Sequence, residues 1–172
     1  MSAVALFGIQ FTLSLIGYAL AAWWYLAPRL ARMPRRDALQ PLLWVHAARI
    51  VGGTVLAPAA VGAAVPILFQ RLVGIGDIVT AAIAIVALIM LRYRIVGAIA
   101  VVWLLLIFGL LDTIDAIIQS LRYHVFTEPL GVNWVIVTGF VPALLVSSVL
   151  ILVQLLRRES GTVETAATLV TP

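Results

Sequence analysis

Cysteine and lysine are both missing from this chain of 172 residues, and charge of either sign is scarce. Without cysteine there can be no disulfide, no thiolate metal ligand and no cysteine nucleophile. Only 10% of the residues are Asp, Glu, Lys or Arg, whereas a soluble globular domain carries about 25%. Such a chain cannot cover a globular surface with polar groups, which excludes an ordinary water-soluble domain.

Apolar residues make up 64% of the sequence, so we expect the lipid bilayer to be the main partner of the chain. The net charge of +4 would suggest a nucleic-acid partner in a soluble protein. Here the arginines stand mostly at the ends of apolar runs, where they orient a chain in the membrane. We therefore predict no nucleic-acid binding.

Five apolar segments are long enough to be transmembrane helices, because a span needs about 20 mostly apolar residues. The sequence thus predicts an all-α integral membrane bundle in one domain, residues 1–158, with spans at about 3–27, 39–61, 74–91, 95–121 and 132–156. Residues 159–172 lack apolar periodicity and are predicted to form a disordered cytoplasmic tail.

Prolines disturb two of these spans. Pro58 and Pro66 interrupt the second apolar run, and a proline inside a helix removes a hydrogen bond and clashes with the preceding turn. We expect the second helix to kink or end near Pro58 and residues 62–73 to form a short outer loop. A re-entrant segment within residues 58–73 is the alternative. Pro142 predicts a kink in the fifth helix.

The arginines between the spans predict the orientation. Eight fall on one side of the predicted membrane: Arg29, Arg32, Arg35, Arg36, Arg92, Arg94, Arg157 and Arg158. Only Arg71 and Arg122 fall on the other side. Because arginine accumulates in cytoplasmic loops, we expect the N-terminus outside and the C-terminus in the cytoplasm.

Ionisable residues within the spans are the candidates for function, because each costs at least about 2.5–3.5 kcal/mol at the centre of a membrane helix. The second span carries His46 and Arg49, which share one face, and Gly53 continues that face by four residues. Arg49 is expected near mid-membrane. It is either the centre of a polar site or a structural residue that pairs with a carboxylate or reaches the inner interface.

The third span begins with Gly74-Ile75-Gly76-Asp77. We expect Asp77 about one turn inside the outer end of this helix, where a carboxylate favours the positive end of the helix dipole. That interpretation makes Asp77 a helix-start residue. The alternative places it in the polar cluster of the neighbouring spans.

The fourth span carries a stripe of polar residues spaced by three, four and three: Asp112, Asp115, Gln119 and Arg122. This is a helical period, and lipid cannot solvate the stripe, so we expect it to face the bundle interior. Asp112 and Arg49 reach comparable depth and form the expected buried ion pair, with Asp77 or Asp115 as alternative partners.

Three carboxylates against one deep arginine leave at least one carboxylate in surplus. That carboxylate must be hydrated from the outer side or protonated, which points to proton or cation handling. The two histidines, His46 and His124, are expected near opposite membrane faces. A lone His46 is a hydrogen-bonded interior residue in this interpretation, and we predict no metal site and no cofactor.

Residues 74–77 resemble the Gly-x-Gly-Asp motif of intramembrane aspartyl proteases, in which a second aspartate completes a dyad that activates water. The resemblance implies Asp77 as one catalytic residue and Asp112 or Asp115 as the other. In presenilin-like enzymes the partner aspartate precedes the motif, whereas here it follows. Their Pro-Ala-Leu motif has only Pro142-Ala143-Leu144 as a counterpart, without the preceding catalytic helix.

A wider pattern is similar to a group of uncharacterised bacterial polytopic membrane proteins. Its features are Arg49 with two glycines, Pro66 ahead of the Gly-x-Gly-Asp turn, Gly109-Leu110-Leu111-Asp112, and Pro142 on the last helix. The resemblance brings no known activity. It implies a multi-pass protein of the bacterial inner membrane in which the arginine and the aspartates belong to one architecture.

Three functions fit these features. The first is a small membrane-embedded binding, transport or accessory subunit, with a polar or ligand-binding cluster of His46, Arg49, Asp77, Asp112, Asp115 and Gln119. Five spans are few for a transporter acting alone, so a homo-oligomer or a larger membrane complex is expected. The second is an intramembrane hydrolase using Asp77 and Asp112. The third is a purely structural subunit in which every charge is paired, and non-enzymatic functions are favoured.

Overall fold

The computed structural model describes residues 1–57, 60–62 and 65–157, and these form helices and connecting turns with no strand. The predicted all-α fold is therefore confirmed for the described part of the chain. The elements in chain order are α1 (Ala3–Ala21), the π-helical turn η1 (Ala22–Leu26), α2 (Ala27–Ala31), α3 (Arg35–Ala47), the 3-10 helix η2 (Ala48–Leu56), α4 (Ile67–Arg92), α5 (Ala98–Arg122), the 3-10 turn η3 (Val125–Thr127), α6 (Val132–Val135), the π-helical turn η4 (Ile136–Phe140) and α7 (Val141–Leu156).

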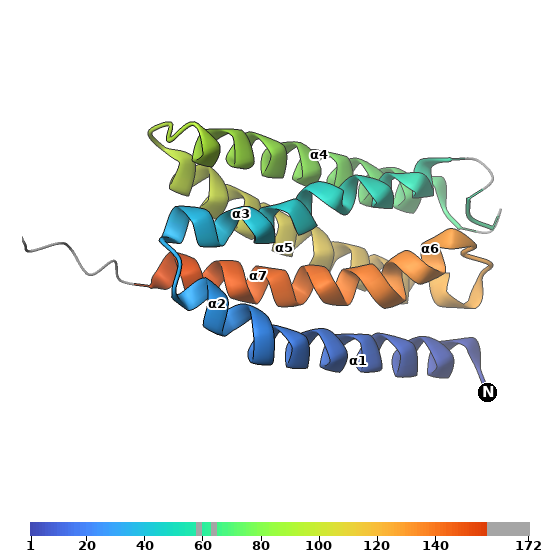
Figure 1. Ribbon diagram of the computed structural model, residues 1–172. Helices are drawn as coiled ribbons and strands as arrows, with labels where there is room; N and C mark the ends of the chain where they lie inside the picture. Colours follow the sequence, from blue (N-terminus) through green and yellow to red (C-terminus); the bar gives the residue numbers. More distant parts are fainter. Residues whose placement is uncertain (58–59, 63–64, 158–172) are drawn as a thin grey trace, which may run out of the picture.

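These elements join end to end into helical rods that lie side by side in a bundle (Figure 1). Four rods are long and apolar enough to cross a membrane: Ala3–Ala31, Ile67–Arg92, Ala98–Arg122 and Val132–Leu156. The fifth rod is α3 followed by η2, which continues in the same general direction without a break. Its α-helical part, with 13 residues, is shorter than the other four.

The rods have two common ends. The N-terminus lies at one end with the segments that connect η2 to α4 and α5 to α6 (Figure 1). The connections from α2 to α3 and from α4 to α5 lie at the other end, where α7 also finishes. We call these the N-terminal end and the C-terminal end of the bundle.

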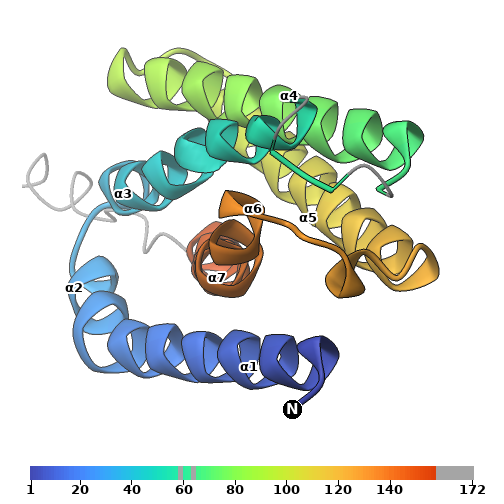
Figure 2. The ribbon, with the colours of Figure 1, turned by 90° about the vertical axis from the view of Figure 1, so that its right-hand side faces the viewer.

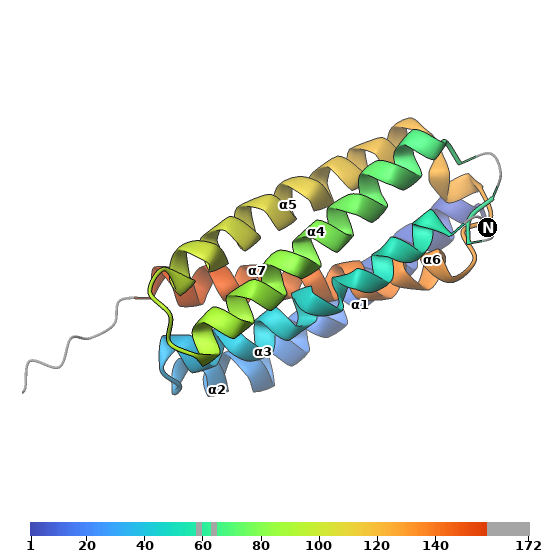
Figure 3. The ribbon, with the colours of Figure 1, turned by 90° about the horizontal axis from the view of Figure 1, so that it is seen from above.

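The rod of α6, η4 and α7 occupies the middle of the bundle (Figure 2). On one side of it lies the group of α3, α4 and α5, in which α4 and α5 run next to each other (Figure 3). On the other side lies α1, which has no buried residue of its own. Most of the apolar surface of α1 is therefore exposed in the bundle.

Two apolar clusters make up the core of the described residues. The larger cluster joins α3, α4, α5 and α7 toward the C-terminal end, and small side chains such as Ala81, Ala84 and Ala87 let α4 pack closely there. The smaller cluster lies at the N-terminal end and contains Phe69 and Phe126. Arg49, Asp77 and Asp112, which are discussed below, lie between these two clusters along their helices.

Two helices contain a π-helical turn shortly before a proline. Pro28 follows η1 and Pro142 follows η4. A proline clashes with the carbonyl four residues earlier, here those of Trp24 and Thr138, and both carbonyls lie in the wider π turn. The irregularity expected at Pro142 is thus a widened turn within a rod that spans the predicted residues 132–156.

The start of α4 differs from the prediction. Residues 62–73 were expected to form a loop, but α4 begins at Ile67, directly after Pro66. Proline suits this place because its fixed φ matches a helix start and its missing N–H has no partner to lose. Pro66 is therefore a start signal, and the predicted loop is replaced by helix from Ile67 onward.

The other boundaries differ less from the predictions. The first rod continues to Ala31 instead of ending at 27, and α5 covers 98–122 instead of 95–121. Gly97, with a φ of +86°, forms the turn into α5. The second rod covers residues 35–56 rather than 39–61. Pro58 and the predicted tail, residues 159–172, lie outside the described residues.

Candidate functional site

Arg49 lies on η2 near the middle of the bundle and is only 4% exposed. Its Nε donates to the carboxylate of Asp77 on α4, and its Nη2 donates to the carboxylate of Asp112 on α5. Its Nη1 donates to the carbonyl oxygen of Gly109, also on α5, over 3.1 Å. A single guanidinium therefore connects three rods, and we call Arg49, Asp77 and Asp112 the charged triad.

The winding of η2 explains how Arg49 reaches this position. Residues three apart lie on one line of a 3-10 helix. The buried residues of η2 are Arg49, Gly52 and Val55, which have this spacing. The prediction that Gly53 continues the face of Arg49 was wrong, because it rests on α-helical winding, and the 3-10 winding aligns Gly52 instead.

Two glycines make room for the carboxylates of the triad. A Cβ added to Gly52 would lie 2.6 Å from Cγ of Asp77, and a Cβ added to Gly76 would lie 2.7 Å from Cγ of Asp112. Real Cβ atoms do not approach so closely. Gly52 thus lets Asp77 lie directly against η2, and Gly76 lets Asp112 lie directly against α4.

The carbonyl of Gly109 accepts a second hydrogen bond, from the hydroxyl of Thr113 at 2.7 Å. On α4 the hydroxyl of Thr80 donates to the carbonyl of Gly76 at 2.8 Å. Both threonines are buried, so their hydroxyls need these backbone partners. The polar groups beside the triad are in this way satisfied within their own helices.

The triad contains one positive and two negative groups, so its formal charge is −1 when all three are ionised. One oxygen of each carboxylate is used by Arg49. The second oxygens, Oδ2 of Asp77 and Oδ1 of Asp112, accept no hydrogen bond from the described residues. The two side chains retain 13% and 14% exposure.

The predicted ion pair between Arg49 and Asp112 is present, and the alternative partner Asp77 is bonded at the same time. The interpretation of Asp77 as a helix-start residue is wrong, because α4 starts ten residues earlier, at Ile67. Asp77 therefore lies about 15 Å along the helix. This depth brings it level with Arg49.

The other members of the predicted cluster do not join the triad. Asp115 is exposed on α5, so the expectation that the whole polar stripe faces the interior is wrong. A step of three residues turns an α-helix by about 300°, which moves Asp115 about 60° further from the interior than Asp112. Gln119 is half-buried, with its Oε1 buried and without a partner among the described residues. Arg122 is exposed beside the ring of Tyr123.

His46 is 1% exposed, and neither ring nitrogen has a hydrogen-bond partner in the described part of the chain. The expected hydrogen-bonded interior histidine is therefore buried but unpaired. No group of three or more His, Cys, Asp or Glu side chains among the described residues could hold a metal ion.

A cavity of about 340 Å³ extends from the triad toward the N-terminal end of the bundle. Arg49, Gly52 and Asp77 border it on one side. Most of its other lining is apolar and includes five aromatic rings from four parts of the chain: Phe7, Phe11, Phe69, Phe126 and Phe140. We call this cavity the chamber.

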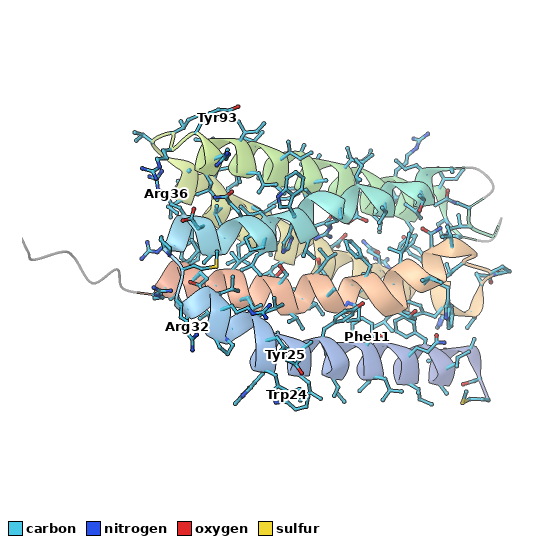
Figure 4. The ribbon with its side chains drawn as sticks, viewed as in Figure 1. Phe11, Trp24, Tyr25, Arg32, Arg36 and Tyr93 are labelled. Atoms are coloured by element: carbon cyan, nitrogen blue, oxygen red, sulfur yellow. The ribbon has the colours of Figure 1, made fainter. Side chains whose placement is uncertain are left out.

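The helix α1 closes the chamber on the side opposite η2. Phe7 stacks on Phe126, with ring centroids 3.9 Å apart, and Phe11 lies toward the inside of the bundle from α1 (Figure 4). Trp24 and Tyr25 extend outward from the same rod. Near the N-terminal end, Nε1 of Trp134 donates to Oε1 of Gln10 over 2.6 Å, which ties α1 to α6.

Several residues of the site were not predicted from the sequence. Asn133 accepts a hydrogen bond from Thr54 at 3.0 Å and donates to the carbonyl of Ala60 at 3.0 Å, so it fastens η2 to α6 beside the chamber. A polar amide at the start of an apolar run is a signal that could have identified it. Phe7 and Phe11 carried no such signal, because one phenylalanine among many apolar residues is not distinctive.

The fold and the site define an α-helical bundle with a charged triad inside, and four of its rods are long and apolar enough to cross a membrane. The chain belongs to the family described as "Domain of unknown function (DUF8737)", whose model matches residues 6–156. The match includes every residue of the triad and the lining of the chamber. Comparison with curated proteins and with solved structures gave no match.

The glycines beside the triad give the first prediction. Gly52→Ala and Gly76→Ala should each destabilise the protein by about 1–3 kcal/mol, because the new Cβ overlaps a carboxylate that cannot move away from Arg49. Thermal unfolding in detergent measures the effect. Gly17→Ala is the matched control, since a Cβ there meets nothing within 4 Å, and it should be neutral or slightly stabilising. Equal stability of all three variants would contradict the packing described.

The second prediction concerns the charges. Arg49→Gln should cost about 3–5 kcal/mol, because it leaves two carboxylates buried without their cation. Adding Asp77→Asn and Asp112→Asn to this variant should restore most of the loss, since no unpaired charge remains. Unfolding of the single, double and triple variants measures the coupling. Asp115→Asn, at an exposed position, should cause no loss. A triple variant as unstable as Arg49→Gln would rule out charge pairing as the cause.

Proposed function

We propose that this protein is a five-span, multi-pass protein of the bacterial inner membrane that binds a small lipophilic molecule in the chamber. The N-terminus lies outside and the C-terminus lies in the cytoplasm. The protein acts as a binding or accessory subunit rather than as an enzyme. The observation that carries this proposal is the chamber itself, an apolar cavity that reaches a charged triad in the middle of a membrane bundle.

The length of the second rod supports the fifth span. The 13 residues of α3 and the 9 residues of η2 rise by about 20 Å and about 18 Å, respectively. Their sum exceeds the hydrocarbon thickness of about 30 Å. The 3-10 winding thus lengthens a rod whose α-helical part alone is too short.

The arginines support the orientation. In the described residues, seven lie at or near the C-terminal end of the bundle: Arg29, Arg32, Arg35, Arg36, Arg92, Arg94 and Arg157. Arg71 and Arg122 lie toward the N-terminal end. The positive-inside rule assigns the arginine-rich end to the cytoplasm. The chamber then belongs to the outer half of the membrane.

Several properties of the chamber favour ligand binding. Its volume of about 340 Å³ falls within the range of small-molecule sites, about 300–1,000 Å³. Its walls are mainly apolar and aromatic, and its few polar side chains are those of Arg49, Asp77, Thr113, Ser120 and Asn133. An apolar surface with a small number of placed polar groups is typical of binding pockets.

The pairing of the aspartates favours binding over hydrolysis. An aspartyl dyad works because two adjacent carboxylates share one proton, so that one of them acts as an acid. Here a guanidinium lies between Asp77 and Asp112 and bonds to both. Among the described residues no hydrogen bond joins the two carboxylates directly, unlike the two carboxyl groups of a dyad. A purely structural role explains the triad but leaves the chamber without a purpose.

The topology gives the third prediction, and the absence of cysteine makes it simple to test. We expect a membrane-impermeant maleimide to label Thr127→Cys in intact spheroplasts, and to label Ala31→Cys and Val96→Cys only after permeabilisation. All three positions are exposed and lie in or beside connections between rods. Labelling of Ala31→Cys together with Thr127→Cys would show that the rod of α3 and η2 does not cross. The reverse pattern would invert the orientation.

Ligand binding gives the fourth prediction. The neutral fluorophore N-phenyl-1-naphthylamine should bind saturably to the protein in nanodiscs, with empty nanodiscs as the background. Ala116→Trp should weaken binding by about tenfold or more, because the indole fills space in the chamber. Ile118→Trp is the matched control, since Ile118 is 57% exposed on the outward face of the same helix. Equal binding by the wild type and a folded Ala116→Trp variant would refute the chamber as the site.

A further inference from the structure

The charged triad beside the chamber has a formal charge of −1 when all three groups are ionised. Arg49 has used its Nε, Nη1 and Nη2 donors on Asp77, Gly109 and Asp112. No second cation among the described residues forms an ion pair with either aspartate. Asp77 borders the chamber and keeps one carboxylate oxygen without a donor. A ligand in the chamber therefore lies next to the Asp77 carboxylate, whose second oxygen faces Gly52, another residue of the lining.

The surroundings of this acceptor restrict which cation fits it. A small metal ion needs several oxygen or nitrogen ligands, and the described residues contain no group of three acidic or histidine side chains suited to it. The remaining lining is mainly apolar, so it cannot replace the water shell of an inorganic ion. An organic cation carries its own apolar groups and needs no such shell.

The aromatic side chains favour the same class of ligand. Phenylalanine faces attract cations through the ring quadrupole, and five phenylalanines line the chamber. They also suit the apolar body of an amphipathic molecule. The Asp77 carboxylate, the aromatic lining and the volume of the chamber all favour an organic cation as the ligand.

We propose that the chamber binds a lipophilic organic monocation, whose charged group lies against Asp77 and whose apolar body lies among the aromatic rings. One positive charge balances the surplus of the triad. The inference rests on the proposed function, because it names the ligand class of the same chamber. It adds a selectivity by charge that an apolar cavity alone would not have.

Two probes of the same shape and opposite charge test this selectivity. Tetraphenylphosphonium is a cation, and tetraphenylborate is the matching anion. Each is used to displace N-phenyl-1-naphthylamine from the wild-type protein in nanodiscs, with free concentrations corrected by empty nanodiscs. We expect tetraphenylphosphonium to displace the fluorophore at a concentration about tenfold or more below that of tetraphenylborate.

Variants assign the selectivity to the triad. Asp77→Asn should abolish the preference for the cation, because the carboxylate that selects it is gone, and thermal unfolding shows whether the variant is folded. Asp115→Asn removes an exposed carboxylate from a neighbouring helix and should leave both properties unchanged. If Asp77→Asn fails to fold, the comparison of the two ions on the wild type still decides the question.

The outcomes separate the two proposals. If the neutral fluorophore binds but the two ions compete equally, or Asp77→Asn keeps the preference, the monocation inference is overturned and the binding chamber stands. If the neutral fluorophore does not bind saturably, the binding chamber is refuted and the monocation inference fails with it. A cation preference that depends on Asp77 and not on Asp115 supports both.

Discussion

The buried guanidinium of Arg49 is the constraint on which the rest of the bundle depends. Arginine stays charged in proteins, so it must find acceptors wherever it is placed. Asp77, Asp112 and the Gly109 carbonyl provide them from two other rods. This demand fixes the register of η2, α4 and α5 at one level, and it requires glycine at the points where the rods touch. The two apolar clusters, on either side of the triad, then pack in the register that the charged groups determine.

The sequence alone predicted a large part of this arrangement. Charged residues are easy to recognise in an apolar chain, so Arg49 and Asp112 could be paired from their expected depth in the membrane. The helical fold class followed from composition. The role of Asp77 was misjudged because Pro66 looks the same in a sequence whether it ends a helix or begins one. Asp115 was misplaced because spacing defines a stripe only to within about 60° of the helix surface. Which residues contact one another depends on how the backbone winds and how the helices pack. Neither can be inferred from a single sequence.

The chamber illustrates the same limit at a larger scale. Its lining comes from α1, η2, α4, α5 and the rod of α6 and α7, which are distant in the sequence. None of the apolar residues involved is unusual for a membrane helix. The chamber is distinctive because apolar side chains from all these elements lie next to Asp77. They come together only when the rods pack. Helix α1 matters in this respect because, although none of its residues is fully buried, it provides Phe7 and Phe11 to the wall.

The winding of η2 has a geometric consequence of its own. Rewinding its nine residues as α-helix would shorten the segment by about 4–5 Å, because the rise per residue falls from about 2.0 to 1.5 Å. Over the six residues from Arg49 to Val55, the angle between the two side chains would change by about 120°. The number of residues per turn in this one stretch thus determines both where the rod ends and which side chains share a face with Arg49.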